Sequence, residues 1–90
     1  MSYFVYVIGS LKNSKPKTYV GWTKDLKERL RKHNSGKGAK STKGRKWKII
    51  YHEIFNSKKK AMQREYTIKK DKKFRQALKK INEDLVFRKF

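Results

Sequence analysis

The segment from Tyr3 to Ile8 restricts the possible fold most strongly, because every one of its residues is aromatic or β-branched. Such side chains favour extended backbone, and an unbroken run of this length is typical of a strand that is covered on both faces. Gly9 and Ser10 follow the run and are expected to end it. We therefore predict a well-buried strand at the start of the chain.

A second run of the same kind extends from Thr18 to Thr23. The segment between the two runs, Ser10 to Lys17, contains Asn13, Ser14 and Pro16, which are residues that favour turns. Two apolar runs joined by turn-forming residues are typical of a hairpin. We expect the two strands to pair in antiparallel orientation.

The third element has the period of a helix. Asp25 is a suitable N-cap, and Leu26, Leu30 and His33 recur on one face of the predicted helix. The glycine-containing segment from Asn34 to Lys46 ends this helix. Because that segment is strongly basic and has no large apolar side chain, we expect it to form a flexible loop.

Residues 47–55 alternate loosely and predict a third strand. The expected faces are Trp47, Ile49, Tyr51 and Phe55 on one side and Ile50 and Ile54 on the other. Because both sets are apolar, we expect both faces of the sheet to be at least partly covered.

Two helices should follow the third strand. Ser57 is a suitable cap for a helix that continues to about Lys70, and an apolar stripe predicts a last helix from Asp71 to about Phe90. The stripe consists of Phe74, Leu78, Ile81 and Leu85. Three strands cannot bury both of their faces alone, so the helices must pack on the sheet. The expected fold is a single α/β (α+β) domain over residues 1–90, a three-stranded antiparallel sheet flanked by helices in the order β-β-α-β-α-α.

The charge of the chain indicates its class of partner. There are 27 lysine and arginine residues against 7 aspartate and glutamate residues, which gives a formal net charge of +20. Such a chain attracts phosphates and releases their condensed counterions, so DNA, RNA and anionic membrane surfaces are candidates. A surface that is charged only for solubility ordinarily mixes both signs. Membrane binding is the weakest of the three, because the apolar stripe of the last helix is better explained as core.

The composition also excludes several kinds of site. Without cysteine the chain has neither a disulfide framework nor a thiolate zinc site, and His33 and His52 lack the spacing of a metal-binding pair. No segment approaches the ~20 apolar residues of a membrane span, and the N-terminal residues do not have the pattern of a signal peptide. We therefore expect a soluble, cytoplasmic protein.

Glu65 is an unexpected residue at its position in the predicted helix. Counting about 100° per residue places it within the arc of Ala61 and Ile68, which should face the sheet. A buried carboxylate is normally paired with a cation or bound to a metal ion, because an unpaired buried charge is strongly unfavourable. In a chain with 27 cations, a salt bridge and a metal site explain this residue equally well.

Four other residues become candidates for a site only in combination. Arg29 and His33 stack on the first predicted helix, because they are separated by one turn. Tyr6 and Tyr19 lie on successive predicted strands, and each phenol can form a hydrogen bond while its ring fills space. Taken singly, they are better explained as a solvated arginine, a boundary histidine and two core tyrosines.

Several short motifs, each weak by itself, occur in a specific order and spacing. They are Val5-Tyr6-Val7, Tyr19-Val20-Gly21, Asp25 to Leu30, His33 to Gly36, and Ala61 to Glu65 followed by Ile68 to Lys70. This ordered set, which extends from about Tyr3 to Phe74, resembles the GIY-YIG nuclease superfamily. The similarity is greatest to its small stand-alone members and extends to the N-terminal domain of the excision-repair incision subunit.

The resemblance implies a role for each candidate in the hydrolysis of a phosphodiester bond. Tyr6 and Tyr19 would lie beside the scissile phosphate, Arg29 would neutralise the charge of the transition state, and His33 would assist proton transfer or contact phosphate. Glu65 would bind one divalent metal ion, with Mg²⁺ as the expected ion and Mn²⁺ as an alternative. The general base stays open: the positive field should favour the phenolate of Tyr6, and water activated by the metal ion is an equal alternative.

The resemblance also implies that the basic loop and the basic last helix hold the nucleic-acid backbone without reading bases. The loop cations are Lys37, Lys40, Lys43, Arg45 and Lys46. Larger GIY-YIG enzymes carry separate domains that select the target, and this sequence has none, so a protein partner could supply specificity.

Two functions remain open at this point. The first is a metal-dependent endonuclease that acts on DNA and is directed by the structure of its substrate more than by sequence. The second is a non-catalytic module for RNA or DNA, in which Glu65 pairs with Arg29 or another cation. Trp22 stands where the excision-repair subunit has a lysine, so loss of activity is compatible with the sequence. The sequence does not predict an oligomeric state.

Overall fold

A computed structural model describes residues 1–12 and 15–82 of the chain. Its sheet has three antiparallel strands, β1 (Tyr3–Lys12), β2 (Lys15–Thr23) and β3 (Trp47–Phe55), in the order β2-β1-β3. The central strand β1 is therefore the predicted well-buried strand, and β2 and β3 are the edges.

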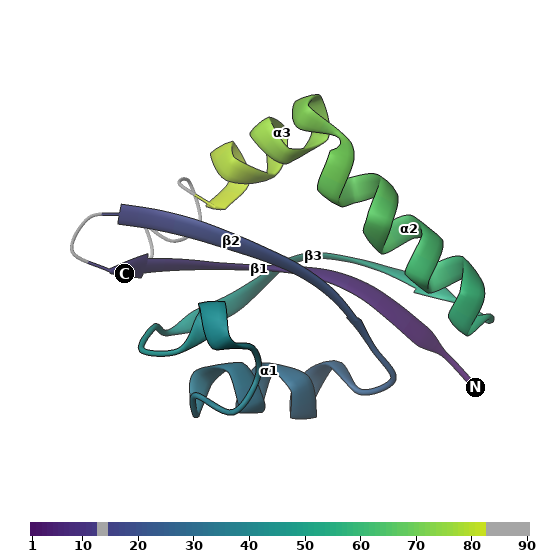
Figure 1. Ribbon diagram of the computed structural model, residues 1–90, viewed down its shortest axis with the longest axis horizontal. Helices are drawn as coiled ribbons and strands as arrows, with labels where there is room; N and C mark the ends of the chain where they lie inside the picture. The colour runs from purple at the N-terminus through teal and green to yellow at the C-terminus, as the bar shows by residue number, and fades with distance from the viewer. Residues whose placement is uncertain (13–14, 83–90) are drawn as a thin grey trace.

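The helices lie on both sides of this sheet (Figure 1). Helix α1 (Leu26–Asn34) covers one face, together with a short 3-10 helix, η1 (Lys40–Thr42). Helices α2 (Lys58–Lys70) and α3 (Lys72–Asn82) cover the other face. The predicted order β-β-α-β-α-α and the predicted antiparallel sheet are confirmed.

The hairpin is tighter than the sequence predicted. Ser10 pairs with Lys17 and Leu11 with Pro16, so most of the expected loop from Ser10 to Lys17 belongs to the strands. Turn-forming residues did not break the ladder because backbone pairing does not require apolar side chains. Pro16 is tolerated because β2 is an edge strand, where a missing N–H need not interrupt the sheet. The turn residues Asn13 and Ser14 lie outside the described residues.

A bulge in β3 changes the predicted faces of that strand. Val7 pairs with Tyr51 and Ile8 with Ile49, so Ile50 is an extra residue opposite β1. An extra residue reverses the alternation of side chains beyond it. The prediction that one face carries Trp47, Ile49, Tyr51 and Phe55 is therefore wrong.

The core consists of two layers, one on each side of β1. Val5 and Val7 face α2 and α3, where they pack with Val20, Ala61, Ile68 and Leu78. Tyr6 and Ile8 face α1 and pack with Trp47 and Ile49. The alternation of β1 thus supplies apolar side chains to both layers, as the unbroken run predicted.

The helix starts follow the predicted caps. Asp25 accepts a hydrogen bond from the N–H of Glu28, and Ser57 accepts one from the N–H of Lys60. In α3, Leu78 is buried, whereas Ile81 is exposed. Leu85 and the last part of the predicted helix lie outside the described residues.

Candidate active site

The candidate site contains a buried chain of three hydrogen-bonded side chains. The hydroxyl of Tyr6 lies 2.8 Å from Nε2 of His33, and Nδ1 of the same ring lies 2.9 Å from the hydroxyl of Thr42. These residues come from β1, from the last turn of α1 and from η1. Each is at most 2% exposed, so their polar atoms depend on one another for hydrogen bonds.

Thr42 determines which nitrogen of His33 carries the proton. The Thr42 hydroxyl donates to the carbonyl oxygen of Ala39 at 2.8 Å and accepts from the N–H of Ala39 at 3.2 Å. Because a hydroxyl has one proton, it accepts from His33, and the neutral ring carries its proton on Nδ1. Nε2 is then free to accept the proton of Tyr6. Burial and the charge of Arg29 lower the pKa of His33, which favours this neutral ring.

The loop that carries Thr42 is anchored to the fold, although the sequence predicted a flexible segment. The indole N–H of Trp47 donates to the carbonyl oxygen of Thr42 at 2.8 Å, and the side chain of Asn34 bonds the backbone of Trp47. Gly38 lets the loop pass close to His33, since a Cβ there would lie 2.3 Å from Nδ1. Sequence reasoning missed Thr42 because one threonine among lysines and glycines gives no signal of burial.

The pKa of Tyr6 moves in the opposite direction to the one predicted. Burial raises it well above the ordinary value of 10.0, and the charge of Arg29 lowers it by less. Tyr19 and Glu65 raise the pKa further. Tyr6 is therefore protonated, and its hydroxyl acts as a donor. Arg29, Tyr19 and Glu65 thus all contribute to the electrostatic environment of Tyr6.

The glycine of the motif Tyr19-Val20-Gly21 is required for a steric reason. Gly21 pairs with Tyr6 across the hairpin, and a Cβ on Gly21 would lie 2.5 Å from the Tyr6 hydroxyl oxygen. Only a glycine leaves room for that hydroxyl. Tyr19 packs beside His33, with the ring centroids 5.1 Å apart, and is only partly buried.

Arg29 lies on α1, one turn before His33, as predicted. It is partly buried and lines a groove of about 270 Å³ at the junction of β2 and α1, together with Trp22, Lys24 and Lys32. Its guanidinium can therefore act on Tyr6 and still contact a ligand in the groove.

Glu65 lies on α2, in the layer of the fold opposite to α1. Helix α2 lies on the other side of the sheet from α1 (Figure 1), and Ala61 and Ile68 are its buried residues, as predicted. The Glu65 side chain is 22% exposed and forms an ion pair with Lys69 across 3.7 Å. This separation is longer than a hydrogen bond. The carboxylate is thus partly buried and only loosely paired.

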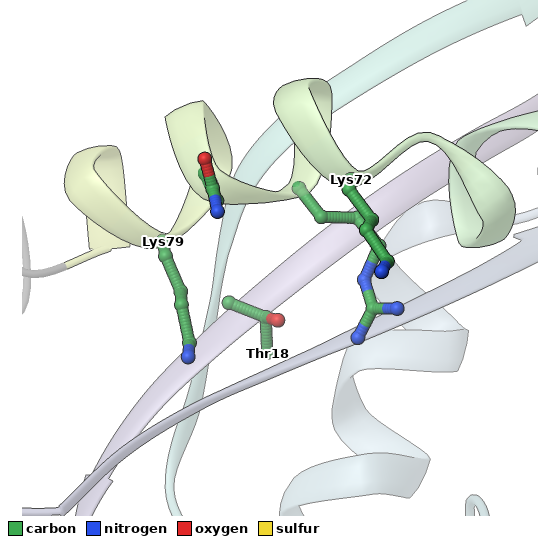
Figure 2. A pocket seen from close by; sticks show the side chains of 5 residues that line it. Thr18, Lys72 and Lys79 are labelled. Atoms are coloured by element: carbon green, nitrogen blue, oxygen red, sulfur yellow. The ribbon is translucent and has the colours of Figure 1, made fainter.

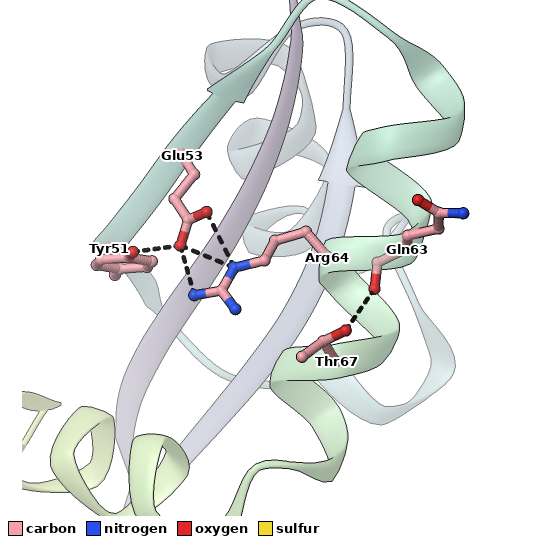
Figure 3. A network of polar contacts seen from close by, with 5 residues as sticks. All are labelled: Tyr51, Glu53, Gln63, Arg64 and Thr67. Carbon is pink, nitrogen blue, oxygen red and sulfur yellow. Dashed lines mark hydrogen bonds and ion pairs between the residues drawn. The ribbon is translucent and has the colours of Figure 1, made fainter.

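Glu53, another partly buried carboxylate, has a structural role. Its oxygens accept from Nε and Nη2 of Arg64 at 3.0 and 2.9 Å and from the hydroxyl of Tyr51 (Figure 3). The hydrogen bonds from Arg64 hold the pKa of this carboxyl below its ordinary range. The carboxylates that also accept hydrogen bonds within the protein are Asp25, Glu28 and Asp71. Among the described carboxylates, Glu65 is the most weakly paired within the protein.

A divalent ion at this place would have Glu65 as its protein ligand. Within residues 1–12 and 15–82, no group of three or more metal-binding side chains is present. Mg²⁺ is commonly held by one or two carboxylates and completes its coordination with water and substrate phosphates. A partly exposed, loosely paired carboxylate fits that ion, whereas a zinc site would require three or four protein ligands.

The predicted backbone-binding cations of the loop fall into two groups. The exposed members are Lys37, Lys40, Lys43 and Lys46. Arg45 is partly buried and donates from Nη1 to the hydroxyl of Ser10 at 3.0 Å and to the carbonyl oxygen of Lys15 at 3.1 Å. Arg45 thus connects the loop to the hairpin, and the four lysines are available to solvent.

A further basic groove of about 150 Å³ lies between α3 and β2. Lys72 and Lys79 extend from the helix toward the strand, on either side of Thr18 (Figure 2). Arg75 also lines this groove and donates to the carbonyl oxygen of Lys69. Cations of the last predicted helix therefore gather beside the edge strand.

Comparison with known proteins shows the family of the chain. Residues 2–82 match the family model of the GIY-YIG catalytic domain, and the chain belongs to this nuclease-type family. It is 46% identical to the UPF0213 protein CPE1444 of Clostridium perfringens (strain 13 / Type A) over 74% of this chain and 70% of that protein. It is 44% identical to the UPF0213 protein SH2523 of Staphylococcus haemolyticus over 74% of this chain and 79% of that protein.

A solved structure is also similar. The solution NMR structure of the UPF0213 protein BH0048 from Bacillus halodurans shares 38% identity and a TM-score of 0.48, over 87% of this chain and 82% of that chain. Separately, none of the helices in the described ranges is long and apolar enough to cross a membrane.

Proposed function

We propose that the chain is a metal-dependent endonuclease that hydrolyses phosphodiester bonds in DNA and is directed by substrate structure more than by sequence. The observation that carries the proposal is the buried chain of Tyr6, His33 and Thr42, with Arg29 one helical turn from His33. The weakly paired carboxylate of Glu65 lies on α2. Nucleic acid is the substrate class of a nuclease-type domain, and a net charge of +20 suits a polyanion.

The exposure of each residue suggests what it contacts. Arg29 and Tyr19 are partly exposed and would contact the phosphate, where the guanidinium balances the negative charge of the transition state. Glu65 would hold the divalent ion, which when bound polarises the phosphate and makes water easier to deprotonate.

The buried chain offers a route for the proton of the attacking water. In the proposal, the Tyr6 hydroxyl accepts that proton while its own proton moves to Nε2 of His33, so no free phenolate forms. The Nδ1–H bond to Thr42 then holds the imidazolium. The water oxygen forms a bond to phosphorus as the bond to the leaving oxygen breaks. This is the general arrangement of a reacting group, a base and a residue that orients the base.

The ion pair between Glu65 and Lys69 provides a matched test. Glu65→Gln and Lys69→Gln both remove this pair, but only the first removes the proposed metal ligand. Glu65→Gln should abolish cleavage with little change in affinity, and Lys69→Gln should still cut. The assay uses labelled single-stranded, duplex, flapped and branched DNA and matched RNA, with Mg²⁺, Mn²⁺ or chelator.

A non-catalytic module predicts a different pattern. If Glu65 serves only its ion pair with Lys69, the two variants should lose similar amounts of thermal stability, and neither they nor the wild type should cut. Cleavage that persists in Glu65→Gln would contradict the proposed site. Cleavage of RNA with no cleavage of DNA would contradict the proposed substrate.

A further inference from the structure

The outward side of α2 carries an apolar surface that the proposed chemistry does not use. Met62 and Tyr66, one helical turn apart, are 46% and 52% exposed. They line a groove of about 770 Å³, here called the Met62–Tyr66 groove. The other lining residues are Lys58, Lys59, Gln63 and Thr67.

The charges around this groove favour a polyanion. Every charged side chain that lines it is a lysine. In addition, Nζ of Lys70 lies 4.5 Å from the centroid of the Tyr66 ring, a cation–π contact that helps to hold the ring in place. Lys70 lies over one face of the ring, and Tyr66 is 52% exposed, so a ligand can still reach the ring. A flat ring beside several cations is the usual means of holding a base and its phosphate chain.

The groove is also next to the proposed cleavage site. Glu65 directly precedes Tyr66 in α2, and Met62 lies about 60° from Glu65 around the axis of the helix. A nucleic-acid strand with its scissile phosphate near Glu65 would therefore bring a neighbouring base to the groove. Bases inside a duplex are stacked on one another, so only an unpaired base could stack on Tyr66.

We propose that the Met62–Tyr66 groove binds an unpaired nucleobase by stacking on Tyr66. This inference rests on the proposed nuclease function and deepens it, because the groove would favour flapped or branched DNA over fully paired DNA. A protein partner fits less well, since stable protein interfaces bury about 800 Å² on each partner around an apolar centre. Two apolar side chains bordered by lysines form only a small apolar centre.

The test measures binding in the presence of chelator, so that it does not depend on cleavage. Tyr66→Ala should weaken the binding of a short single-stranded oligonucleotide by about fivefold to tenfold and leave blunt duplex binding unchanged. Tyr66→Phe keeps the ring and should bind like the wild type. A 2-aminopurine base in the oligonucleotide should be quenched by the wild type and by Tyr66→Phe but not by Tyr66→Ala. Thermal melting confirms that each variant is folded.

The possible outcomes separate the two proposals. Weaker single-strand binding by Tyr66→Ala, with no cleavage by any protein, would retain the stacking site and reject the nuclease. Equal single-strand affinity of wild type and Tyr66→Ala would reject the stacking site, whatever is cut. If Tyr66→Ala instead loses binding to anionic lipid vesicles while single-strand binding is unchanged, the groove is a membrane contact and the proposal is wrong.

Discussion

The hydroxyl of Thr42 sets the tautomer of His33 and, through it, the direction of the hydrogen bond from Tyr6. The sequence motifs were sufficient to select Tyr6 and His33, because the resemblance covers those positions. They could not reveal Thr42, whose role depends on two hydrogen bonds to Ala39 and on burial by an irregular loop. Nor could they give the direction of the Tyr6 pKa shift, because burial outweighs the charge of Arg29.

Thr42 should act as a positioning residue. Thr42→Val removes the acceptor for Nδ1–H, so His33 can carry its proton on Nε2, where it no longer accepts from Tyr6. We expect cleavage to fall about 10- to 100-fold, the usual effect of losing a residue that orients another. Thr42→Ser keeps the hydroxyl and should restore cleavage in single-turnover assays. A Thr42→Ser variant as slow as Thr42→Val would show that packing, not the hydroxyl, matters.

The pH dependence of cleavage should reflect the lowered pKa of His33. The proposed route needs the neutral ring, so the rate of cleavage should persist below pH 6.5, the ordinary pKa of histidine, and fall only near the lower pKa of the folded protein.

The stability of the fold should depend on pH in a different way. In the unfolded chain His33 gains a proton near pH 6.5, whereas the buried ring of the folded protein stays neutral to a lower pH. The contribution of His33 to the free energy of unfolding is therefore fully present above pH 6.5 and declines as the pH falls toward the pKa of the folded protein. A pH–rate profile measures the dependence of cleavage, and urea unfolding at several pH values measures that of stability. A cleavage rate that already falls through pH 7 would contradict the proposed role of neutral His33.

At the scale of elements, strand and helix positions were predictable because they depend on local period and caps. Asp25 and Ser57 each begin the expected helix, and the apolar run of β1 occupies the middle of the sheet. The bulge at Ile50 was not predictable, since it depends on how β3 pairs with β1. The packing of α3 on the sheet is likewise a long-range property. Gly9 is required there because a Cβ would lie 2.0 Å from Oδ1 of Asn82.

At the scale of the whole molecule, the charge predicts how binding depends on salt. Changing all four exposed loop lysines to glutamine should lower the slope of log K against log salt by about 0.9 for each lysine that contacts a phosphate of duplex DNA. These lysines are Lys37, Lys40, Lys43 and Lys46. Fluorescence anisotropy over a salt series measures the slope. Arg45→Gln is the comparison, and it should mainly reduce thermal stability because its guanidinium connects the loop to the hairpin.

An unchanged slope in the four-lysine variant would show that the loop does not contact the backbone. The basic groove beside α3, with Lys72 and Lys79, would then be the next surface to change.

The position of Glu65 on the opposite layer from His33 links activity to complete folding. Neither layer contains the proposed set of groups alone, because the sheet separates α1 from α2 (Figure 1). Under the proposed function, a chain emerging from the ribosome would be inactive until α2, late in the sequence, has docked. In the proposed nuclease, an incompletely folded molecule would therefore bind DNA through its basic surface without cutting it.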